Sequence, residues 1–439
     1  MTNLAHHINS SLSKELHAMI YLLGFFAQKK SFKVYAVGGF VRDLLLGKEN
    51  RDLDLVVEGS AVDFAKYVAK NLPGQLQCFE RFGTAKLSLS KGIVFDMVTA
   101  RQEFYAGPGA LPDVERSSLK NDLYRRDFTI NTMACALNPE NFGRLYDFFG
   151  GRKDLEKGII RVLYKLSFVD DPLRIIRAIR FEQRFNFIIE EETLTMLRKA
   201  IGNRVLEKVS KERLYNEIRL IFTEPSPLKV LIRLNEMQLL KVIFPRLEFN
   251  ERLKERLRRL EKGITELVES DPEGKWNYFI LYLSALFYDL SEHDTAYLCH
   301  LMRLRRKERL RLFAVLKKTP KAIPELKKEF IRPARLYFLL NEIPLEGLLL
   351  MTVLEKNDPY LREHISYYRR ELVHRRLLTN GDDLLEKGLT QGPVFNRVLK
   401  SLHEAVLNGK VSGKEEELEY LSYLIKKNNM YQETGEGEK

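Results

Sequence analysis

The spacing of apolar residues changes near residue 167 and divides the chain into two kinds of sequence. Before this point, short runs such as 34–37, 85–90 and 93–99 are apolar or alternate apolar with polar residues, which is typical of strands. After it, apolar residues recur every three or four positions, which is typical of helices packed on one face. We therefore predict an α+β protein, with a small mixed sheet in a head followed by an all-α neck, body and tail.

This division predicts three domains, with glycine and proline marking breaks inside them. The expected bounds are 1–163 for the head, 164–224 for a helical neck and 225–439 for the body and tail. Glycines and prolines between 101 and 123 predict a long irregular loop. The segment 143–163 reads as a strand, a glycine turn and a last strand of the head sheet. Helix breaks are expected in the body at 226–228, 270–275, 318–324 and 341–347.

Composition and charge restrict the function classes. The 439 residues exceed what one hydrophobic core usually holds. Lys and Arg number 72 against 60 Asp and Glu, and the resulting net charge of +12 suits a polyanionic partner. Cys78, Cys135 and Cys299 lack the spacing of a zinc site or disulfide framework, and no apolar run approaches a membrane span. We expect a protein of the reducing cytoplasm that binds no membrane.

Two aspartates interrupt an apolar strand at 51–57, where the sequence is RDLDLVV. Because successive side chains of a strand point to opposite faces, Asp52 and Asp54 share one face while the leucines enter the core. Two carboxylates about 7 Å apart can share Mg2+ with substrate phosphates. The pair therefore predicts a two-metal phosphoryl or nucleotidyl transfer site, although an isolated D-x-D more often only ends a strand.

The residues before this strand strengthen that prediction. Gly38 and Gly39 follow the apolar run 34–37, and a glycine pair lets the backbone turn and approach a ligand closely. The next residues, FVRDLLLG, include Arg42 and read as a short helix whose N-terminal amides favour an anion. The combination outlines a nucleoside triphosphate site.

Three ordered motifs resemble the tRNA nucleotidyltransferase and bacterial poly(A) polymerase family, the class II CCA-adding branch of the polymerase-β-like nucleotidyltransferases. They are GGFVRDLLLG with RDLDLVV, then RRDFTINTMA, then DDPLRIIRAIRF. The resemblance implies a polymerase-β-like head, with Mg2+ held by Asp52 and Asp54. It also implies a phosphate site lined by Gly38, Gly39 and Arg42.

A third carboxylate is suggested by the same resemblance. Polymerase-β-like enzymes often complete the metal site with an acidic residue on a neighbouring strand, which makes Asp96 a candidate catalytic residue. An aspartate that ends a strand and bonds a loop is an equally weighted alternative.

The second motif implies a nucleotide-binding group at the end of the head. In the family, RRDF-x-x-N holds triphosphate and ribose, which assigns Arg125, Arg126, Asp127 and Asn131 to nucleotide binding. A guanidinium suits phosphate oxygens and stays charged through the transition state, and an amide can bond a ribose hydroxyl. Two adjacent arginines alone would be a solvated surface pair.

The third motif implies base recognition by protein side chains. In the family, usually as E-D-x-x-R, its aspartate and arginine bond the pairing edge of CTP or ATP, roles that fall here to Asp171 and Arg174. Asp170 stands where the family has glutamate, and Arg177 shares the helical face. A salt-bridged helix face is the alternative for an arbitrary helix.

The remaining helices carry weaker signals. Arg213 and Glu217 stand four residues apart and predict a helix-stabilising pair. Basic residues are dense in 301–318 and 367–378, which predicts binding of the acceptor and TΨC stem of tRNA through phosphates. For any single lysine or arginine there, a solvated helix face is the stronger alternative.

The resemblance implies template-independent attack by the 3′-hydroxyl of tRNA on the α-phosphate of CTP or ATP, with pyrophosphate leaving. The long segment 101–123 favours an enzyme able to add A, because family members confined to CC addition tend to have it shortened. An A-adding enzyme stays an alternative, as does a bacterial poly(A) polymerase, although the basic, aromatic strand of that branch is not evident at 80–90. A non-catalytic RNA-binding protein is more remote. The sequence does not reveal the oligomeric state.

Overall fold

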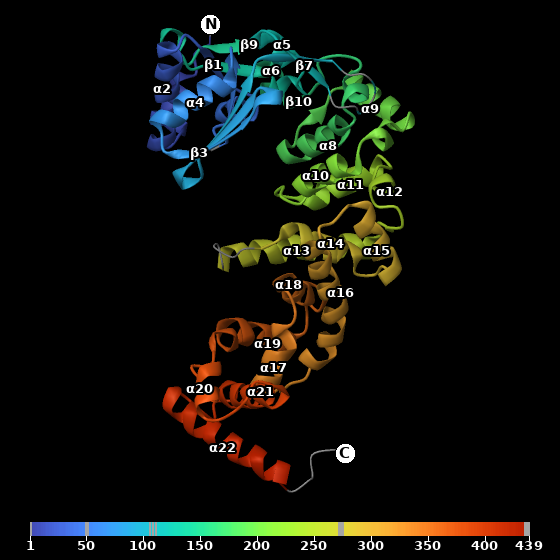
Figure 1. Cartoon of the computed structure of the whole chain (residues 1–439). Helices are drawn as coiled ribbons and strands as arrows, with labels where there is room; N and C mark the ends of the chain where they lie inside the picture. Colours follow the sequence, from blue (N-terminus) through green and yellow to red (C-terminus); the bar gives the residue numbers. More distant parts are fainter. Residues whose placement is uncertain are drawn as a thin grey trace. The chain divides into compact units, whose positions relative to one another are not determined.

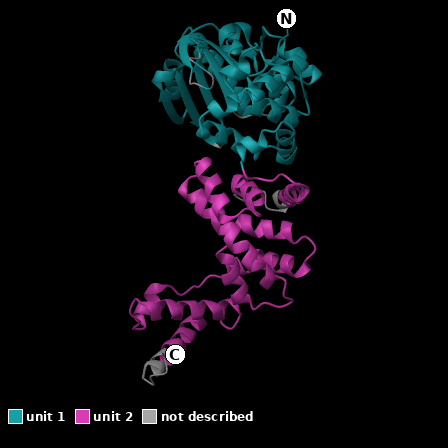
Figure 2. Cartoon of the chain, turned by 90° about the vertical axis from the view of Figure 1, so that its right-hand side faces the viewer, with its two compact units in different colours: residues 1–245 teal, residues 246–439 magenta. Residues whose placement is uncertain are grey.

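The computed structural model describes residues 2–48, 52–104, 107, 109, 112–270 and 276–433, without the side chains of residues 52, 91, 267–270 and 428–433. The chain forms two compact units, residues 1–245 and residues 246–439, which are coloured separately in Figure 2.

Unit 1 is built on a seven-stranded sheet in the order β3-β4-β5-β2-β1-β8-β9. The central strand β2 pairs in parallel with β5 and antiparallel with β1, and the other described neighbours are antiparallel. Its strands are β1 (Lys33–Val37), β2 (Asp52–Glu58), β3 (Gly74–Phe79), β4 (Thr84–Leu89), β5 (Val94–Thr99), β8 (Met133–Ala136) and β9 (Leu145–Asp147). This mixed sheet and the helices that follow it (Figure 1) confirm the predicted α+β class.

Helices cover both faces of the sheet. On one face, α2 (Lys14–Lys29) packs on β1, and α4 (Ala61–Asn71) packs on β3, β4 and β5. Helix α4 begins where the Ser60 hydroxyl accepts the N–H of Asp63, and its apolar residues at helical spacing are buried. On the other face, Leu119 and Leu123 of α5 (Leu119–Tyr124) join a buried cluster with side chains of β1, β2 and β8.

Unit 1 contains further helices between and after these strands. They are α1 (Ala5–Ser11), α3 (Gly39–Leu45), α6 (Gly151–Lys157), α7 (Ser167–Asp170), α8 (Leu173–Phe185), α9 (Glu191–Gly202), α10 (Lys211–Ile221), α11 (Pro227–Glu236) and α12 (Leu240–Ile243).

The segment 101–123 has more regular structure than its glycines and prolines predict. Strands β6 (Arg101–Phe104) and β7 (Asp113–Arg116) pair antiparallel as a separate ribbon, and α5 follows. The prediction of an irregular loop is therefore wrong for these residues. In sequence, the glycines and prolines lie between the two strands. Residues 105, 106, 108, 110 and 111 lie outside the described residues.

The segment 143–163 also differs from expectation. A helix, α6, follows β9, because the Asp147 carboxylate accepts the N–H groups of Gly151 and Arg152 at 2.8 and 3.0 Å and caps the helix. The next strand, β10 (Ile159–Ile160), pairs with β11 (Ile188–Ile189) in its own two-stranded sheet. The head sheet therefore ends at β9.

The regular secondary structure of unit 2 is entirely helical over its described residues. Its helices are α13 (Glu251–Ser270), α14 (Tyr278–Phe287), α15 (Glu292–Leu301), α16 (Arg306–Leu326), α17 (Pro333–Asn341), α18 (Leu345–Leu354), α19 (Pro359–Arg370), α20 (Gly381–Glu386), α21 (Pro393–Leu407) and α22 (Lys414–Glu433).

Two of the predicted helix breaks of the body are confirmed and one is wrong. Helices α11 and α18 begin at the predicted breaks 226–228 and 341–347, whereas 271–275 lie outside the described residues. Helix α16 continues through Pro320 and Pro324, against expectation. Buried residues on both sides of the prolines hold its face against α14 and α18, and this packing outweighs the lost backbone hydrogen bonds.

No single helix of the described residues is long and apolar enough to cross a membrane. One bent pair, α17 with α18, passes a test of length and composition, and many of its apolar residues lie in the buried core of unit 2.

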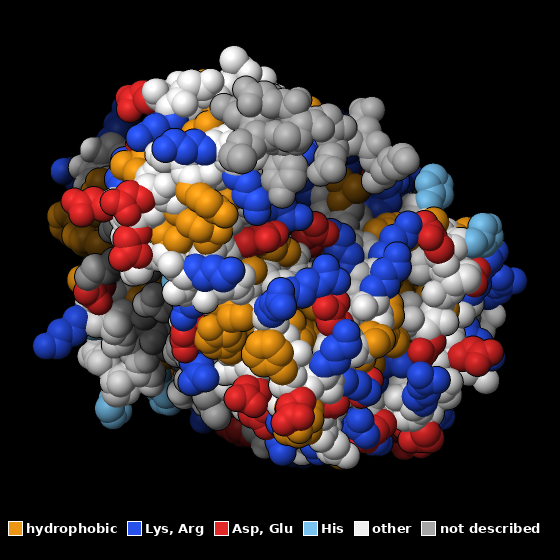
Figure 3. Space-filling model, turned by 90° about the horizontal axis from the view of Figure 1, so that it is seen from below, with side chains coloured by type: hydrophobic (Ala, Val, Ile, Leu, Met, Phe, Trp, Pro, Cys, Tyr) orange, Lys and Arg blue, Asp and Glu red, His pale blue; other side chains and the backbone are white. Residues whose placement is uncertain are grey.

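Basic residues of unit 2 are partly neutralised by acidic ones. Figure 3 shows Lys and Arg side chains interspersed with Asp and Glu on the face seen from below. On α16, Arg311, Lys317 and Lys318 each lie within 3 Å of a glutamate oxygen. The predicted contact of these helices with tRNA stays a prediction.

Candidate functional site

A pocket of about 350 Å³ in unit 1 brings together residues of all three sequence motifs. Its walls come from the turn after β1 with α3, from β2 and β6, from the segment after α5, and from α8 with Asp171, two residues before it. The lining residues are Gly38, Gly39, Arg42, Asp54, Glu103, Arg125, Arg126, Asp127, Asn131, Asp171, Arg174, Arg177 and Phe181.

Gly38 marks a close approach of backbone to side chains in this pocket. Its φ of 68° lies in the left-handed region, which glycine adopts readily. A Cβ built there would lie 2.7 Å from Nη1 of Arg126 and 3.7 Å from Oδ2 of Asp54. A cationic and an anionic side chain therefore reach the same glycine at the start of α3.

The aspartates of the sheet lie on neighbouring strands. Asp54 lines the pocket, and it is paired in register with Asp96 across the parallel strands β2 and β5. Asp96 does not line the pocket, and its Oδ2 lies 3.2 Å from Nζ of Lys86 on β4. Asp52 begins β2, but its side chain lies outside the described part of the chain.

A buried carboxylate fixes the two adjacent arginines. Asp122 of α5 is fully buried, and its oxygens accept hydrogen bonds from Arg125 at 2.7 Å and from Arg126 at 3.2 Å. Burial opposes the charge of Asp122, but the guanidinium groups of Arg126 and Arg125 outweigh it, and the pKa of Asp122 is lowered. Arg125 also donates to Glu103 at 2.8 Å. The pair is thus an ordered part of the site, unlike a solvated surface pair.

Arg42 is buried and holds Asn131. Its Nη1 donates to Oδ1 of Asn131 at 2.7 Å, and its Nε donates to Asp43 at 2.9 Å. The Phe185 ring lies 4.7 Å from its guanidinium carbon. Nδ2 of Asn131 donates to Asp127 at 2.9 Å, so both ends of the amide are fixed.

Asp171 is joined to two distant segments by Arg213. The Arg213 guanidinium donates to Oδ1 of Asp171 at 3.0 Å and to the carbonyl of Gly109 at 3.1 Å. Glu217 instead accepts hydrogen bonds from Arg177 and Arg180. The predicted pairing of Arg213 with Glu217 is therefore wrong, because each has a stronger partner on another element.

The arginines of α8 are also held by the protein. Arg174 is 3% exposed and donates to Tyr164, Ser167 and the carbonyl of Arg125, at 2.6–3.1 Å. Burial disfavours the charge on Arg177, but Asp127 and Glu217 outweigh it and raise the pKa of this arginine.

Of the predicted site residues with described side chains, only Asp96 and Asp170 do not line the pocket. Sequence reasoning missed Glu103, Asp122 and Phe181, and it gave Arg213 a different role. Asp122 precedes Arg126 by four residues, a spacing that signals an ion pair on a helix, but the segment 101–123 was expected to be irregular. Glu103 and Arg213 gave no such signal, because their partners are distant in sequence.

Comparisons with known proteins identify relatives of this chain. Residues 34–161 match the family described as Poly A polymerase head domain, and residues 186–250 match the one described as Probable RNA and SrmB- binding site of polymerase A. The A-adding tRNA nucleotidyltransferase of Halalkalibacterium halodurans is 30% identical, over 95% of both chains.

Two further comparisons differ in how much of the relative they cover. The A-adding tRNA nucleotidyltransferase of Geobacter sulfurreducens is 37% identical over 94% of this chain, but the chain spans only 47% of that protein. The Thermotoga maritima CCA-adding enzyme, solved in complex with tRNA, is 35% identical with a TM-score of 0.67, over 96% of this chain and 98% of that one. The chain belongs to the family of tRNA nucleotidyltransferases and bacterial poly(A) polymerases.

Proposed function

We propose that this protein is a template-independent tRNA nucleotidyltransferase that transfers C, A or both from CTP and ATP to the 3′ end of tRNA. The observation that carries the proposal is the pocket that gathers Gly38, Asp54, Arg126, Asn131 and Asp171 in one cavity. Phosphate, ribose and base each meet a suitable group there.

The triphosphate would bind at the glycine turn. Arg126 reaches Gly38, and Asp122 holds its guanidinium in place before substrate arrives. A fixed cation aimed at the phosphates stabilises the charge that develops as pyrophosphate leaves. The absence of a side chain at Gly38 leaves room for phosphate oxygens beside the backbone.

The ribose and base would bind along the other wall of the pocket. Oδ1 of Asn131 accepts one hydrogen bond, from Arg42, and a carbonyl oxygen has a second lone pair for a ribose hydroxyl. Oδ1 of Asp171 is used by Arg213, and among the described residues Oδ2 has no hydrogen-bond partner. This oxygen is suited to accept from the amino group of cytosine or adenine. Arg174 would provide the donor for the ring by exchanging one of its protein partners.

The donor chemistry at Asp54 fits a divalent cation such as Mg2+. Its carboxylate borders the same glycine as Arg126, and hard carboxylate oxygens are the ligands that Mg2+ takes beside substrate phosphates. No three described His, Cys, Asp or Glu side chains cluster as a metal site on their own, so Asp52 and the triphosphate would complete the set. Bound there, Mg2+ would neutralise phosphate charge and lower the pKa of the attacking hydroxyl. Asp96, paired with Lys86, would support this face of the sheet.

Two properties of the whole protein follow as part of the proposal. The solved Thermotoga enzyme binds tRNA, which supports tRNA as the partner of this chain, with the basic helices 301–318 and 367–378 facing its acceptor and TΨC stem. The cysteines are free thiols, which supports the cytoplasm as its compartment.

A restricted activity, the addition of A only, is the second candidate. Both curated relatives described above carry the name A-adding tRNA nucleotidyltransferase, and the Halalkalibacterium relative matches over 95% of both chains. The Thermotoga relative, of similar identity, is a CCA-adding enzyme. The two activities share the pocket and differ in which end of tRNA is extended.

Extension of three tRNA transcripts distinguishes these activities. The transcripts end before CCA, after C and after CC, and each is incubated with Mg2+ and with CTP, ATP or both. Completion of all three to CCA supports the full activity, and a single A added only to the CC end supports the restricted one. A long ladder of A would identify a poly(A) polymerase. No extension of any transcript would contradict the enzymatic proposal.

A further inference from the structure

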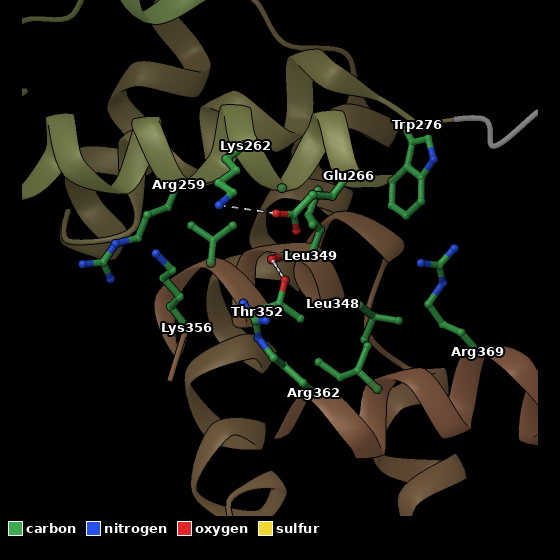
Figure 4. A pocket seen from close by; sticks show the side chains of 13 residues that line it. Arg259, Lys262, Glu266, Trp276, Leu348, Leu349, Thr352, Lys356, Arg362 and Arg369 are labelled. Atoms are coloured by element: carbon green, nitrogen blue, oxygen red, sulfur yellow. Dashed lines mark hydrogen bonds and ion pairs between the residues drawn. The ribbon is translucent and has the colours of Figure 1, made fainter. Parts of the chain in front are cut away.

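Unit 2 contains a second pocket that the proposed reaction does not use. It has a volume of about 350 Å³ and lies between α13, α18 and α19, with Trp276 at one end. Figure 4 shows its side chains, with Arg369 beside Trp276 at one end and Arg259 with Lys356 at the other. The floor is apolar and is formed by Leu348, Leu349, Val353 and Ile365.

Cationic side chains dominate the polar lining. Arg259, Lys262, Lys356, Arg362 and Arg369 line the pocket, whereas Glu266 is its only lining carboxylate among the described residues. Glu266 pairs with Lys262 at 3.9 Å, and Arg259 donates to Glu255. Neither Lys356 nor Arg362 forms a hydrogen bond or ion pair with another described residue. The pocket therefore presents positive charge that the described side chains do not neutralise, and this charge attracts an anion.

The aromatic end of the pocket offers a flat surface beside a cation. Nε1 of Trp276 is buried and has no hydrogen-bond partner among the described residues. An indole N–H can only donate, so this group lacks the acceptor that a buried donor normally has. The guanidinium carbon of Arg369 lies 5.3 Å from the centre of the ring. A planar group against the exposed part of the ring would extend this stack.

We propose that this pocket binds one nucleotide, with its base against Trp276 and its phosphate at Arg362 and Lys356. A nucleotide combines the two features that the lining favours, namely a flat ring and an anionic group a few ångströms away. The volume of the pocket is at the lower end of the range for small-molecule pockets, which suits a single nucleotide. The nucleotide is either a free molecule or an unstacked residue of an RNA, because both present the same chemistry.

The free-nucleotide form of this proposal stands without the function proposed for unit 1, whereas the RNA form rests on it. All lining residues belong to unit 2, so the site is separate from the pocket that contains Asp54.

The tryptophan provides a direct readout, because it is the only one in the chain. Its fluorescence is followed in the full-length protein while AMP, inorganic phosphate or a tRNA transcript is added. We expect a saturable change, with phosphate displacing the ligand without reproducing the change. A response to AMP identifies a free nucleotide as a ligand, and a response to tRNA alone identifies the RNA form.

Matched variants locate the response. Arg362→Ala should weaken the apparent affinity about tenfold, because a charge-assisted hydrogen bond is lost. Lys410→Ala removes an exposed cation of unit 2 that lies outside the pocket and outside the basic segments 301–318 and 367–378, and it should leave the response unchanged. Asp54→Ala should keep the response to AMP even where it stops nucleotide transfer, which separates this proposal from the function of unit 1.

Two results would overturn the inference. One is the absence of a saturable change with AMP at millimolar concentration and with tRNA. The other is a response of unchanged affinity in both Arg362→Ala and Lys356→Ala, since the ligand would then lie elsewhere.

Discussion

The two pockets have similar volumes but hold their basic side chains differently. In unit 1, Arg42, Arg126 and Arg174 are fixed by buried or partly buried acceptors. In unit 2, Lys356 and Arg362 line the pocket without a partner among the described residues. Fixed charges suit a reaction, because they need no rearrangement as charge develops, whereas unpaired cations suit simple binding of an anion. The difference suggests that rigid arginine networks identify the chemical site of this chain.

Replacement of Asp54 by alanine should have the largest effect of the variants that test this difference between the pockets. We expect transfer to fall by at least about 10³-fold, because the carboxylate acts on the reacting phosphates. Binding of tRNA, measured by filter retention, should change less than about twofold. Asp63→Ala, at an exposed position of α4, is the control for both measurements. Loss of tRNA binding together with transfer would show that Asp54 has a structural role.

Asp122→Asn tests whether the arginines of unit 1 are held by a buried charge. Breaking such a network should lower the free energy of unfolding by about 3 kcal/mol near neutral pH. The pKa of Asp122 is lowered, so its stabilisation is present above the ordinary value of 3.8 and is lost as pH falls through the lower folded value.

The Asp122→Asn variant should therefore lose less stability than the native protein when the pH is lowered below about 4. Urea denaturation at several pH values measures both effects. Identical pH profiles of the two proteins would mean that Asp122 does not carry this charge.

Arg311→Ala tests an ion pair of unit 2 whose carboxylate is fully buried. Glu346 is fully buried and accepts from Arg311 at 2.8 Å, so we expect a loss of about 2 kcal/mol. The matched variant Arg335→Ala breaks a more exposed pair with Glu325 and should cost less than about 1 kcal/mol. Denaturant unfolding monitored by Trp276 fluorescence reports on unit 2. Equal losses in the two variants would remove the distinction between buried and exposed pairs.

Gly38→Ala should have the smallest of these effects, and its comparison with Gly39→Ala distinguishes the roles of the two glycines of the turn. A methyl group at Gly38 meets Arg126 and strains a left-handed backbone, so kcat/KM should fall about tenfold. Gly39→Ala should lose less, because its Cβ would lie 3.4 Å from a side-chain atom of Arg42 and its φ is ordinary for a helix start. Steady-state kinetics with ATP measures both. A greater loss of kcat/KM in Gly39→Ala than in Gly38→Ala would contradict the assignment of the close approach to Gly38.

The sequence predicted the parts of the molecule whose causes are local. The strand period around Asp54, the glycine turn and the helical face of Arg174 and Arg177 depend on neighbouring residues, and they lie where expected. The hairpin β6–β7 depends on pairing across a poorly patterned segment, and α16 depends on packing that outweighs two prolines. Neither cause is visible in a local pattern.

Site residues divide in the same way. The motif residues Arg126 and Asn131 were predicted because the motif keeps them together in sequence. Arg213 and Glu103 join the site through partners 42 and 22 residues away, and such distances leave no periodic trace. The pocket of unit 2 was not predicted either, because its wall is assembled from three helices.

The pairing of β1 with β8 has a consequence for how the protein is made. Tyr35 of β1 pairs with Ala136 of β8. During translation, about a hundred further residues, or roughly ten seconds of synthesis, must therefore be added before the second neighbour of β1 exists. During that interval one edge of β1 is open to wrong partners. A nascent chain stalled before Met133 would carry the glycine turn and both aspartates on an unfinished sheet, and we expect it to need chaperone protection that the completed chain does not.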